Sequence, residues 1–488
     1  MCDQGENNQS IESLVRELEK FCESDALSLD ALREKINQIT PSSGAIQSSS
    51  FLHRACINKR VTLGIVEFIL DAFPEAALAR TNVLCPNGER TAYPLHFACY
   101  NASCRSSVIE LLMKKNPSAL SHMCVIDEGV GKGDYNHNKY AGGLPLHYYL
   151  MRESNIDLST IKMLVEAYPD ALTIGDGETR ITPIHTLVCN PTIGELCDTV
   201  QFLVETNPSS LRLTDEHNRV PLHVACRNKK MDSKIVRVLL DCWPECTRHR
   251  DVCGDLPIHN LCWDYPIQSL SKNEKSDETA SLEILQLLVK MDPRSVMETN
   301  KNGRLPLHYA AEYKSPEFCK ILVDSYPETL RIETTGGCLP IHRACCWGRV
   351  DTVKYMLELY PESIDMRTRH GSLPIHLAVW CVGNEQVKMI RFLLLQDPDG
   401  ASKTTTKSRN LPLHLACVRS NLDLDVVQLL FDAHPVAIRT NNGDGETPLD
   451  IARRLAGQNS EVISFLETQL TYARKAQDTI SRPKSALF

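Results

Sequence analysis

Residues 302–330 read NGRLPLHYAAEYKSPEFCKILVDSYPETL and contain two phrases that recur along the chain. The first phrase, LPLH, begins at Leu305, and the second, SYPETL, closes an apolar stretch on Pro327. The first phrase occurs in eleven copies. Ten of them have a His in the same place, and the last has Asp450 instead. The histidines are His53, His96, His147, His185, His223, His259, His308, His342, His376 and His414.

The spacing of the two phrases is nearly constant. From the Pro of the second phrase to the next motif His or Asp, the distance is 15 residues in six of ten cases and 16 in two. The exceptions are Pro74 to His96, at 22 residues, and Pro117 to His147, at 30. Regular self-similarity of this length indicates stacked supersecondary units, none of which can bury its apolar face alone.

Each unit contains signals for two helices and a turn. The Pro of LPLH suits the first position of a helix, because its φ is fixed and no amide hydrogen is lost there. Before the second Pro, apolar residues recur with helical spacing, as in Val236, Leu239, Leu240 and Trp243, and that Pro then ends the helix. Turn signals separate the units at Asn302-Gly303, Gly336-Gly337 and Asn442-Gly443. We therefore predict an all-α repeat solenoid of helix-turn-helix units joined by hairpins.

These residues resemble the ankyrin repeat, whose signature Thr-Pro-Leu-His-x-Ala opens the first helix of each unit. Only Thr182 and Thr447 keep the Thr of that signature, and a Pro replaces the family's Gly-rich turn after the second helix. The resemblance implies that the motif His is structural and hydrogen-bonds to the backbone of the adjoining unit. It also implies that the protein binds a partner protein on a concave surface formed by first helices and hairpin tips.

We expect three parts in the chain: a helical cap or degenerate repeat with a linker in residues 1–49, an ankyrin repeat array in 50–470, and a basic, disordered tail in 471–488. Two insertions lengthen connections within the array, at residues 125–143 and 264–281. They either contribute to binding or serve only as connections.

Composition excludes several classes of protein. The chain has 488 residues, a formal net charge of -8 and dispersed Lys and Arg, so nucleic acid is not an expected partner. The sequence shows neither a secretory signal nor an apolar run long enough to span a membrane. We expect a monomer in the cytoplasm or nucleus, with its 20 cysteines reduced.

Candidate chemistry is weak by comparison. Histidines in successive units cannot converge on one site, and the cysteines three residues after a motif His stand where small packing residues belong. A zinc site is a minor alternative, because the possible ligands lack paired Cys-x-x-Cys spacing: Cys242, Cys246, Cys253, His259 and Cys262. The segment GVGKG at 129–133 lacks the spacing of a phosphate loop. We predict no catalytic residues, metal or cofactor.

Helical phase points to a binding surface. Residues four and five after the motif His face away from the second helix, and in ankyrin proteins such positions contact partners. Here they are Tyr100, Met151, Arg227, Trp263, Tyr313, Trp347, Trp380 and Arg419. Because Trp, Tyr and Arg dominate interface hot spots, these residues are the predicted partner-binding set. The alternative is that the rings stack on one another along the array.

Three functions remain open at this point. The first is a non-enzymatic scaffold or adaptor that binds a partner protein. The second is a substrate-targeting subunit of a larger enzyme complex such as a ubiquitin ligase, for which the first 50 residues are long enough to hold a docking motif. The third is an enzyme whose chemistry no motif reveals.

Overall fold

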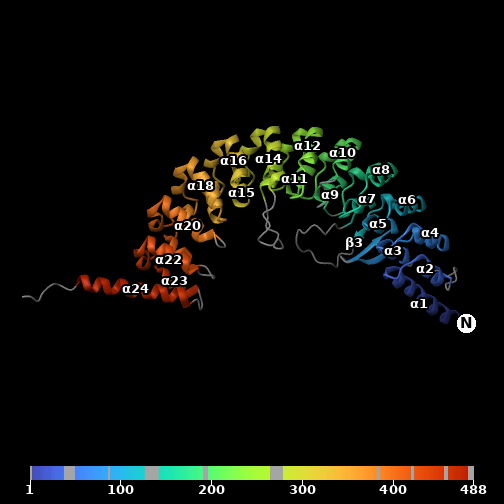
Figure 1. The fold of residues 1–488 in the computed structure, drawn as a ribbon, viewed down its shortest axis with the longest axis horizontal. Coiled ribbons are helices and arrows are strands. Elements are labelled where there is room, and N and C mark those ends of the chain that lie inside the picture. Colours follow the sequence, from blue (N-terminus) through green and yellow to red (C-terminus); the bar gives the residue numbers. More distant parts are fainter. Residues whose placement is uncertain are drawn as a thin grey trace, which may run out of the picture. The chain divides into compact units, whose positions relative to one another are not determined.

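The computed structural model describes residues 3–37, 50–85, 88–126, 142–177, 179–190, 196–263, 278–381, 385–418, 423–455 and 460–481. They form two compact units. Unit 1 comprises residues 1–252 and 277–287, and unit 2 comprises residues 253–276 and 288–488. Both units consist of paired helices, coloured along the chain in Figure 1.

Each copy of the histidine phrase forms a short first helix. From the second copy on, that helix begins at the Pro of the phrase, as predicted. In unit 1 these helices are α3 (Phe51–Ile57), α5 (Pro94–Tyr100), α7 (Pro145–Leu150), α9 (Pro183–Cys189) and α11 (Pro221–Arg227). In unit 2 they are α13 (Pro257–Cys262), α15 (Pro306–Tyr313), α17 (Pro340–Cys346), α19 (Pro374–Ala378), α21 (Pro412–Val418) and α23 (Pro448–Leu455).

The second helices are longer and bury one face. Val236, Leu239 and Leu240 are buried as their spacing predicts, and Trp243 is half-buried. The complete second helices of unit 1 are α4 (Leu63–Ala72), α6 (Ser106–Lys115), α8 (Leu158–Ala167), α10 (Cys197–Thr206) and α12 (Ser233–Cys242). Those that lie wholly in unit 2 are α16 (Pro316–Ser325), α18 (Val350–Leu359), α20 (Glu385–Gln396), α22 (Leu424–Ala433) and α24 (Ser460–Ser481), while α14 (Thr279–Met291) contributes to both units.

The Pro that ends a second helix is also the first residue of the next element. It begins a one-turn 3₁₀ helix, whose first position tolerates Pro for the same reason that an α-helix does. In unit 1 these elements are η1 (Pro74–Ala77), η2 (Pro117–Ser121), η3 (Pro169–Thr173), η5 (Pro208–Arg212) and η6 (Pro244–Arg248). In unit 2 they are η7 (Pro293–Met297), η8 (Pro327–Arg331), η9 (Pro361–Asp365), η10 (Pro398–Ser402) and η11 (Pro435–Arg439).

In successive repeats, first helices pack on first helices and second helices pack on second helices. In unit 1, α5 contacts α3 and α7, and in unit 2, α17 contacts α15 and α19. Two N-terminal helices, α1 (Asp3–Glu23) and α2 (Leu29–Ile36), continue this pattern by packing on α3 and α4, respectively. Together these contacts confirm the predicted all-α repeat architecture.

Asparagine side chains tie the repeats of unit 1 together at the ends of the first helices. The last carbonyls of a helix have no partner within it. Asn190 donates hydrogen bonds to one such carbonyl of the preceding repeat, on Leu150, and to the carbonyl of Arg152 just beyond the helix, both at 2.8 Å. Arg152 does the same one repeat earlier, where its guanidinium donates to Cys99 O at 2.6 Å. The asparagines with this role are Asn58, Asn101, Asn190 and Asn228.

Hairpin tips are joined by a second set of bonds, between backbone groups. In unit 2, the amide of Thr335 donates to Asn302 O at 3.0 Å, and the amide of Arg369 donates to Gly336 O at 2.9 Å. Gly337 has a φ of +70°, and a Cβ there would lie 2.6 Å from the Arg369 nitrogen. The Gly336-Gly337 turn is therefore required by this close approach as well as by its own geometry.

Three features differ from the expectations. The long Pro74 to His96 spacing contains a β-hairpin, in which β1 (Thr81–Cys85) and β2 (Gly88–Ala92) pair, and β3 (Val125–Ile126) adds to β2. Positive φ in the last hairpin falls at Gly445 rather than Gly443. Helix α24 runs to Ser481, so the segment expected to be a disordered tail from residue 471 is helical that far. The central parts of both insertions, 127–141 and 264–277, lie outside the described residues.

Candidate functional site

Most motif histidines hydrogen-bond to the backbone through one or both ring nitrogens. For eight of the ten, Nε2 lies 2.8 to 3.2 Å from a backbone carbonyl oxygen. In most cases, such as His308 with Cys338 O, this carbonyl belongs to the residue before the next phrase, as predicted. For His96, His342 and His414, however, it follows the 3₁₀ helix of the same repeat.

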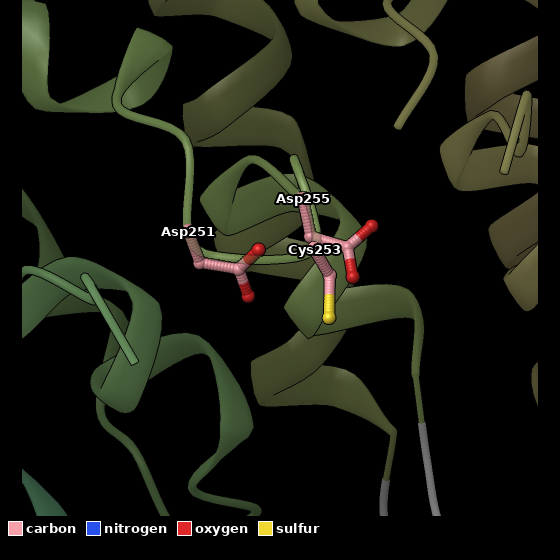
Figure 2. Close-up of side chains that lie close together, drawn as sticks. All are labelled: Asp251, Cys253 and Asp255. Carbon is pink, nitrogen blue, oxygen red and sulfur yellow. The ribbon is translucent and has the colours of Figure 1, made fainter. Parts of the chain in front are cut away.

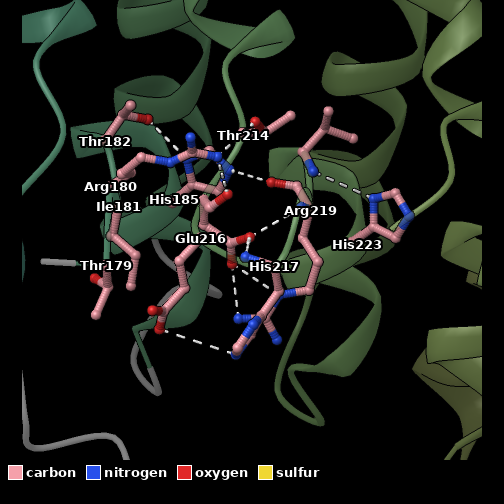
Figure 3. A network of polar contacts seen from close by, with 12 residues as sticks. Thr179, Arg180, Ile181, Thr182, His185, Thr214, Glu216, His217, Arg219 and His223 are labelled. Carbon is pink, nitrogen blue, oxygen red and sulfur yellow. Dashed lines mark hydrogen bonds and ion pairs between the residues drawn. The ribbon is translucent and has the colours of Figure 1, made fainter. Parts of the chain in front are cut away.

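The other ring nitrogen explains why the Thr of the signature is dispensable here. In the Leu and Val copies, Nδ1 accepts a hydrogen bond from the backbone amide three residues earlier, as Val220 donates to His223 in Figure 3. Where Thr182 is retained, its hydroxyl lies 2.8 Å from His185 Nδ1 instead. In the last copy, Asp450 accepts from the amide of Thr447 at 3.0 Å. The residue at the His position therefore stays hydrogen-bonded at the start of the first helix, although the donor differs between copies.

These partners fix the protonation of the imidazoles. A carbonyl can only accept and an amide can only donate, so Nε2 carries the hydrogen. Burial lowers the pKa of His147 and of His342 to about 4, because a charged ring would lose its hydration. These histidines are therefore neutral structural groups. Most of their ring nitrogens are hydrogen-bonded, whereas among the described residues His53 Nδ1, His96 Nδ1 and His376 Nε2 are buried without a hydrogen-bond partner.

The motif cysteines are also structural. Those three residues after a motif His are all buried: Cys56, Cys99, Cys226, Cys262, Cys345 and Cys417. Burial raises the pKa of Cys99 and of Cys417 to about 12, which keeps both thiols protonated. Their burial confirms the prediction that these cysteines are packing residues.

The five predicted zinc candidates do not form a ligand set within the described residues. One group of three potential ligands is found there, Asp251, Cys253 and Asp255, whose ligand atoms lie within 4.8 Å of one another (Figure 2). These residues alternate along one connection and are exposed or half-buried. Since exposed carboxylates gather without a metal in many proteins, we assign no ion to them.

The predicted binding residues of unit 1 lie at or just after the ends of three first helices and differ in exposure. Tyr100 is 43% exposed at the end of α5 and meets Tyr148 edge to face, with ring centroids 6.3 Å apart. Met151 is half-buried after α7, and Arg227 is exposed at the end of α11. Arg419, on the other hand, lies outside the described residues.

In unit 2 the structure brings three of the aromatic residues together. Tyr313 and Trp347 pack with ring centroids 5.0 Å apart, and the side chains of Tyr313 and Trp263 are hydrogen-bonded. Trp347 and Trp380 nevertheless remain 42% and 41% exposed. We call Trp263, Tyr313, Trp347 and Trp380 the aromatic row. Its stacking supports the alternative interpretation in part, but two of its indoles still face solvent.

A buried carboxylate beside this row was missed by the sequence analysis. Glu312 is 1% exposed and pairs with two guanidinium groups, those of Arg343 and Arg304, the latter at 3.5 Å. Burial and the charge of Glu312 together raise the pKa of Tyr313 to about 12. Arg349 donates to the backbone oxygens of Glu312 and Tyr313, at 3.1 and 2.8 Å. The one sequence signal for this carboxylate was that Glu312 stands four residues after His308, at a position predicted to lie on the surface.

A pocket of about 350 Å³ opens next to the two arginines. It lies between the hairpin that precedes α15 and the hairpin that precedes α17. Its lining residues are Asn302, Arg304, Tyr309, Thr334, Thr335, Gly336, Cys338 and Arg343. Arg304 and Arg343 are the charged side chains among them, so the charged part of this wall is cationic.

Comparison with known proteins identifies the repeats. A sequence model for multiple ankyrin repeats matches residues 393–452, and a single-repeat model matches residues 302–328. In these two segments the repeats are ankyrin repeats. Among solved structures, the crystal structure of the ankyrin repeat domain of Bcl-3, described as a unique member of the IkappaB protein family, matches with 21% identity and a TM-score of 0.37. That match covers 51% of this chain and 97% of the other. Comparison with curated proteins gives no match.

Ankyrin repeats generally mediate interactions between proteins and are typically non-catalytic. The ankyrin family thus accounts for the structural role of the histidines and directs attention to the surface of the first helices. None of the described helices is long and apolar enough to cross a membrane.

Proposed function

We propose that this ankyrin protein is a non-enzymatic scaffold or adaptor that binds a partner protein through the first-helix side of its repeats. The observation that supports this is the exposure of Trp347 and Trp380, the large indoles of two successive repeats, of which Trp347 packs against Tyr313. Exposed aromatic side chains at such positions are typical anchors of protein interfaces. The buried motif histidines and cysteines have structural roles, which supports a non-enzymatic function.

The test is affinity purification of the full-length protein, followed by mass spectrometry, with wild type, Trp347→Ala and Trp380→Ala compared. Each substitution should weaken binding of the same partner by about 30-fold or more, the usual effect of removing a hot-spot Trp. Because both indoles are already partly exposed, the thermal unfolding midpoint should change little.

Leu395→Ala is the matched control, because Leu395 is 74% exposed on α20, a second helix. It should leave partner recovery unchanged. Equal loss of stability and of binding in the Trp variants would instead show that the aromatic row is a packing seam between repeats.

A further inference from the structure

The arginines at the pocket carry an unbalanced charge. Arg304 and Arg343 share the single carboxylate of Glu312, which leaves one positive charge uncompensated by that pairing. The Arg343 side chain donates through Nε to Glu312. Within the described residues no hydrogen bond is recorded for its two terminal nitrogens. A guanidinium group has five N–H donors, so further acceptors are needed to satisfy it.

A repeat of unit 1 shows a different environment for an arginine at the equivalent position. Arg219 stands four residues before His223, as Arg304 stands four before His308. Arg219 is neutralised within its own hairpin, because Asp215 Oδ2 accepts from its Nε at 2.7 Å. The corresponding hairpin residue in the Arg304 repeat is Asn300, which has no charge.

The Asn300 side chain is itself hydrogen-bonded to two other side chains. It donates to Asp255 Oδ1 at 2.8 Å and to the Tyr309 hydroxyl at 3.1 Å. The Arg304 guanidinium lies over the Tyr309 ring, 5.0 Å from its centroid. Arg304 is therefore held in place by an aromatic face and by Glu312, and Asp255 is not among the residues that line the pocket.

The pocket is suited to one carboxylate group. Its volume of about 350 Å³ accommodates an acidic side chain with water, and its charged lining is cationic. Arg pairs bind planar carboxylates through parallel hydrogen bonds. A single unbalanced positive charge matches a carboxylate better than a phosphoryl group, whose charge at neutral pH is about -1.5 to -2. Arg343 and Trp347 both belong to the α17 repeat, so a bound segment can reach the pocket and the aromatic row together.

We infer that this pocket binds an Asp or Glu side chain of an acidic partner segment whose neighbouring apolar residue packs on Tyr313 and Trp347. This inference rests on the proposed function and specifies the chemistry of the partner. The bound carboxylate accepts from Arg343 and Arg304, while Glu312 holds the two guanidinium groups in position and limits their net charge.

The test uses a phage-displayed library of random peptides of about a dozen residues, selected on the full-length protein. Enriched peptides should contain Asp or Glu next to an aromatic residue or Leu. Synthetic fluorescent copies are then titrated with each variant by anisotropy. Replacing the acidic residue by Asn or Gln should weaken binding by about tenfold or more, and so should Arg343→Gln. Added salt should also weaken binding.

Glu312→Gln makes the test specific to charge. It removes the competing negative charge, while the Gln oxygen can still accept from a guanidinium group and help to position it, so the affinity for the acidic peptide should rise about threefold or more. Arg294→Gln is the control, because Arg294 is an exposed arginine of unit 2 outside the pocket, and it should have no effect. Arg343→Gln alone also changes the net charge of this cluster. The double variant Glu312→Gln/Arg343→Gln, checked by circular dichroism, keeps the net charge of wild type and should also bind weakly, because one guanidinium group remains for the peptide carboxylate instead of two.

The outcomes separate this inference from the proposed function. Loss of peptide binding on Trp347→Ala without loss on Arg343→Gln would overturn the carboxylate pocket and leave the aromatic anchor in place. A phosphoserine peptide that binds more tightly than the carboxylate peptide, or a library that yields no acidic binder, would also overturn the pocket assignment. If neither Trp347→Ala nor Trp380→Ala affects any selected peptide, the proposed binding surface is wrong.

Discussion

Mild acid should loosen the repeats through their buried histidines, and His308 provides the clearest case. Burial lowers its pKa from 6.5 to about 3, and the nearby cations Arg304 and Arg343 act in the same direction. In the unfolded chain the ring regains its ordinary pKa, so the unfolded state binds more protons between these two values. Stability from this residue is therefore complete above about pH 6.5 and is lost as the pH falls toward 3.

The size of the effect follows from proton linkage. With these two pKa values, His308 alone loses about 2 kcal/mol of stabilisation between pH 7 and pH 5. His308→Gln removes the titration together with the bonds to Leu305 N and Cys338 O. The variant should be about 1 to 3 kcal/mol less stable than wild type at pH 7, and this difference should shrink by about 2 kcal/mol at pH 5.

Hydrogen exchange is the suitable assay, because repeats open locally and the whole array need not unfold in one step. Peptides that cover residues 304–325 would be followed in wild type and His308→Gln at both pH values, each corrected for the intrinsic exchange rate. His370→Gln, at an exposed position, should leave exchange in this region unchanged. A difference in protection that stays constant or widens at pH 5 would refute the assignment of His308 as a buried neutral donor.

Three further predictions concern the contacts between repeats and the thiols. Gly337→Ala should destabilise unit 2 by about 1 to 3 kcal/mol, because φ is +70° and the new Cβ would meet the Arg369 amide; urea denaturation measures this, with the exposed residue Ser402→Ala as a control. Asn190→Ala should cost about 1 to 3 kcal/mol, since two carbonyls of the preceding repeat lose their donor; unchanged exchange protection of α7 would contradict that role. With a thiol-reactive dye at pH 8, the exposed Cys242 and Cys253 should label before Cys345, whose burial raises its pKa well above the ordinary value; early labelling of Cys345 in the folded protein would show that its packing is loose.

Local signals were sufficient to predict most of the fold. Pro306 and its counterparts mark the first turn of each first helix because their backbone geometry is fixed by the residue itself. Pro327 and its counterparts likewise end the second helix, although the sequence did not reveal that each begins a 3₁₀ turn. The burial of Cys345 also followed from its position three residues after the motif His.

The candidate site was predicted only in part. Helical phase identified Tyr313 and Trp347 as neighbours on one side, and they do meet. Phase could not show that Glu312 turns inward to two arginines, because Arg304 comes from the preceding hairpin and Arg343 from the next repeat. Which side chains share a pocket depends on the offset between repeats, and that offset is set by contacts that no single repeat contains.

The sequence by itself determined the repeating unit: where helices begin and end, which face of each is apolar, and that every histidine occupies an equivalent place. These properties are local, since they arise from backbone restriction by Pro and from side-chain spacing. Only the tertiary structure decided which carbonyl each imidazole reaches, that Asn190 caps the helix of its neighbour, and that Arg304 and Arg343 converge on Glu312. The physical reason is that most of these bonds join residues about one repeat apart, as from Asn190 to Leu150 and from Arg343 to Glu312, and their geometry exists only once the units have stacked.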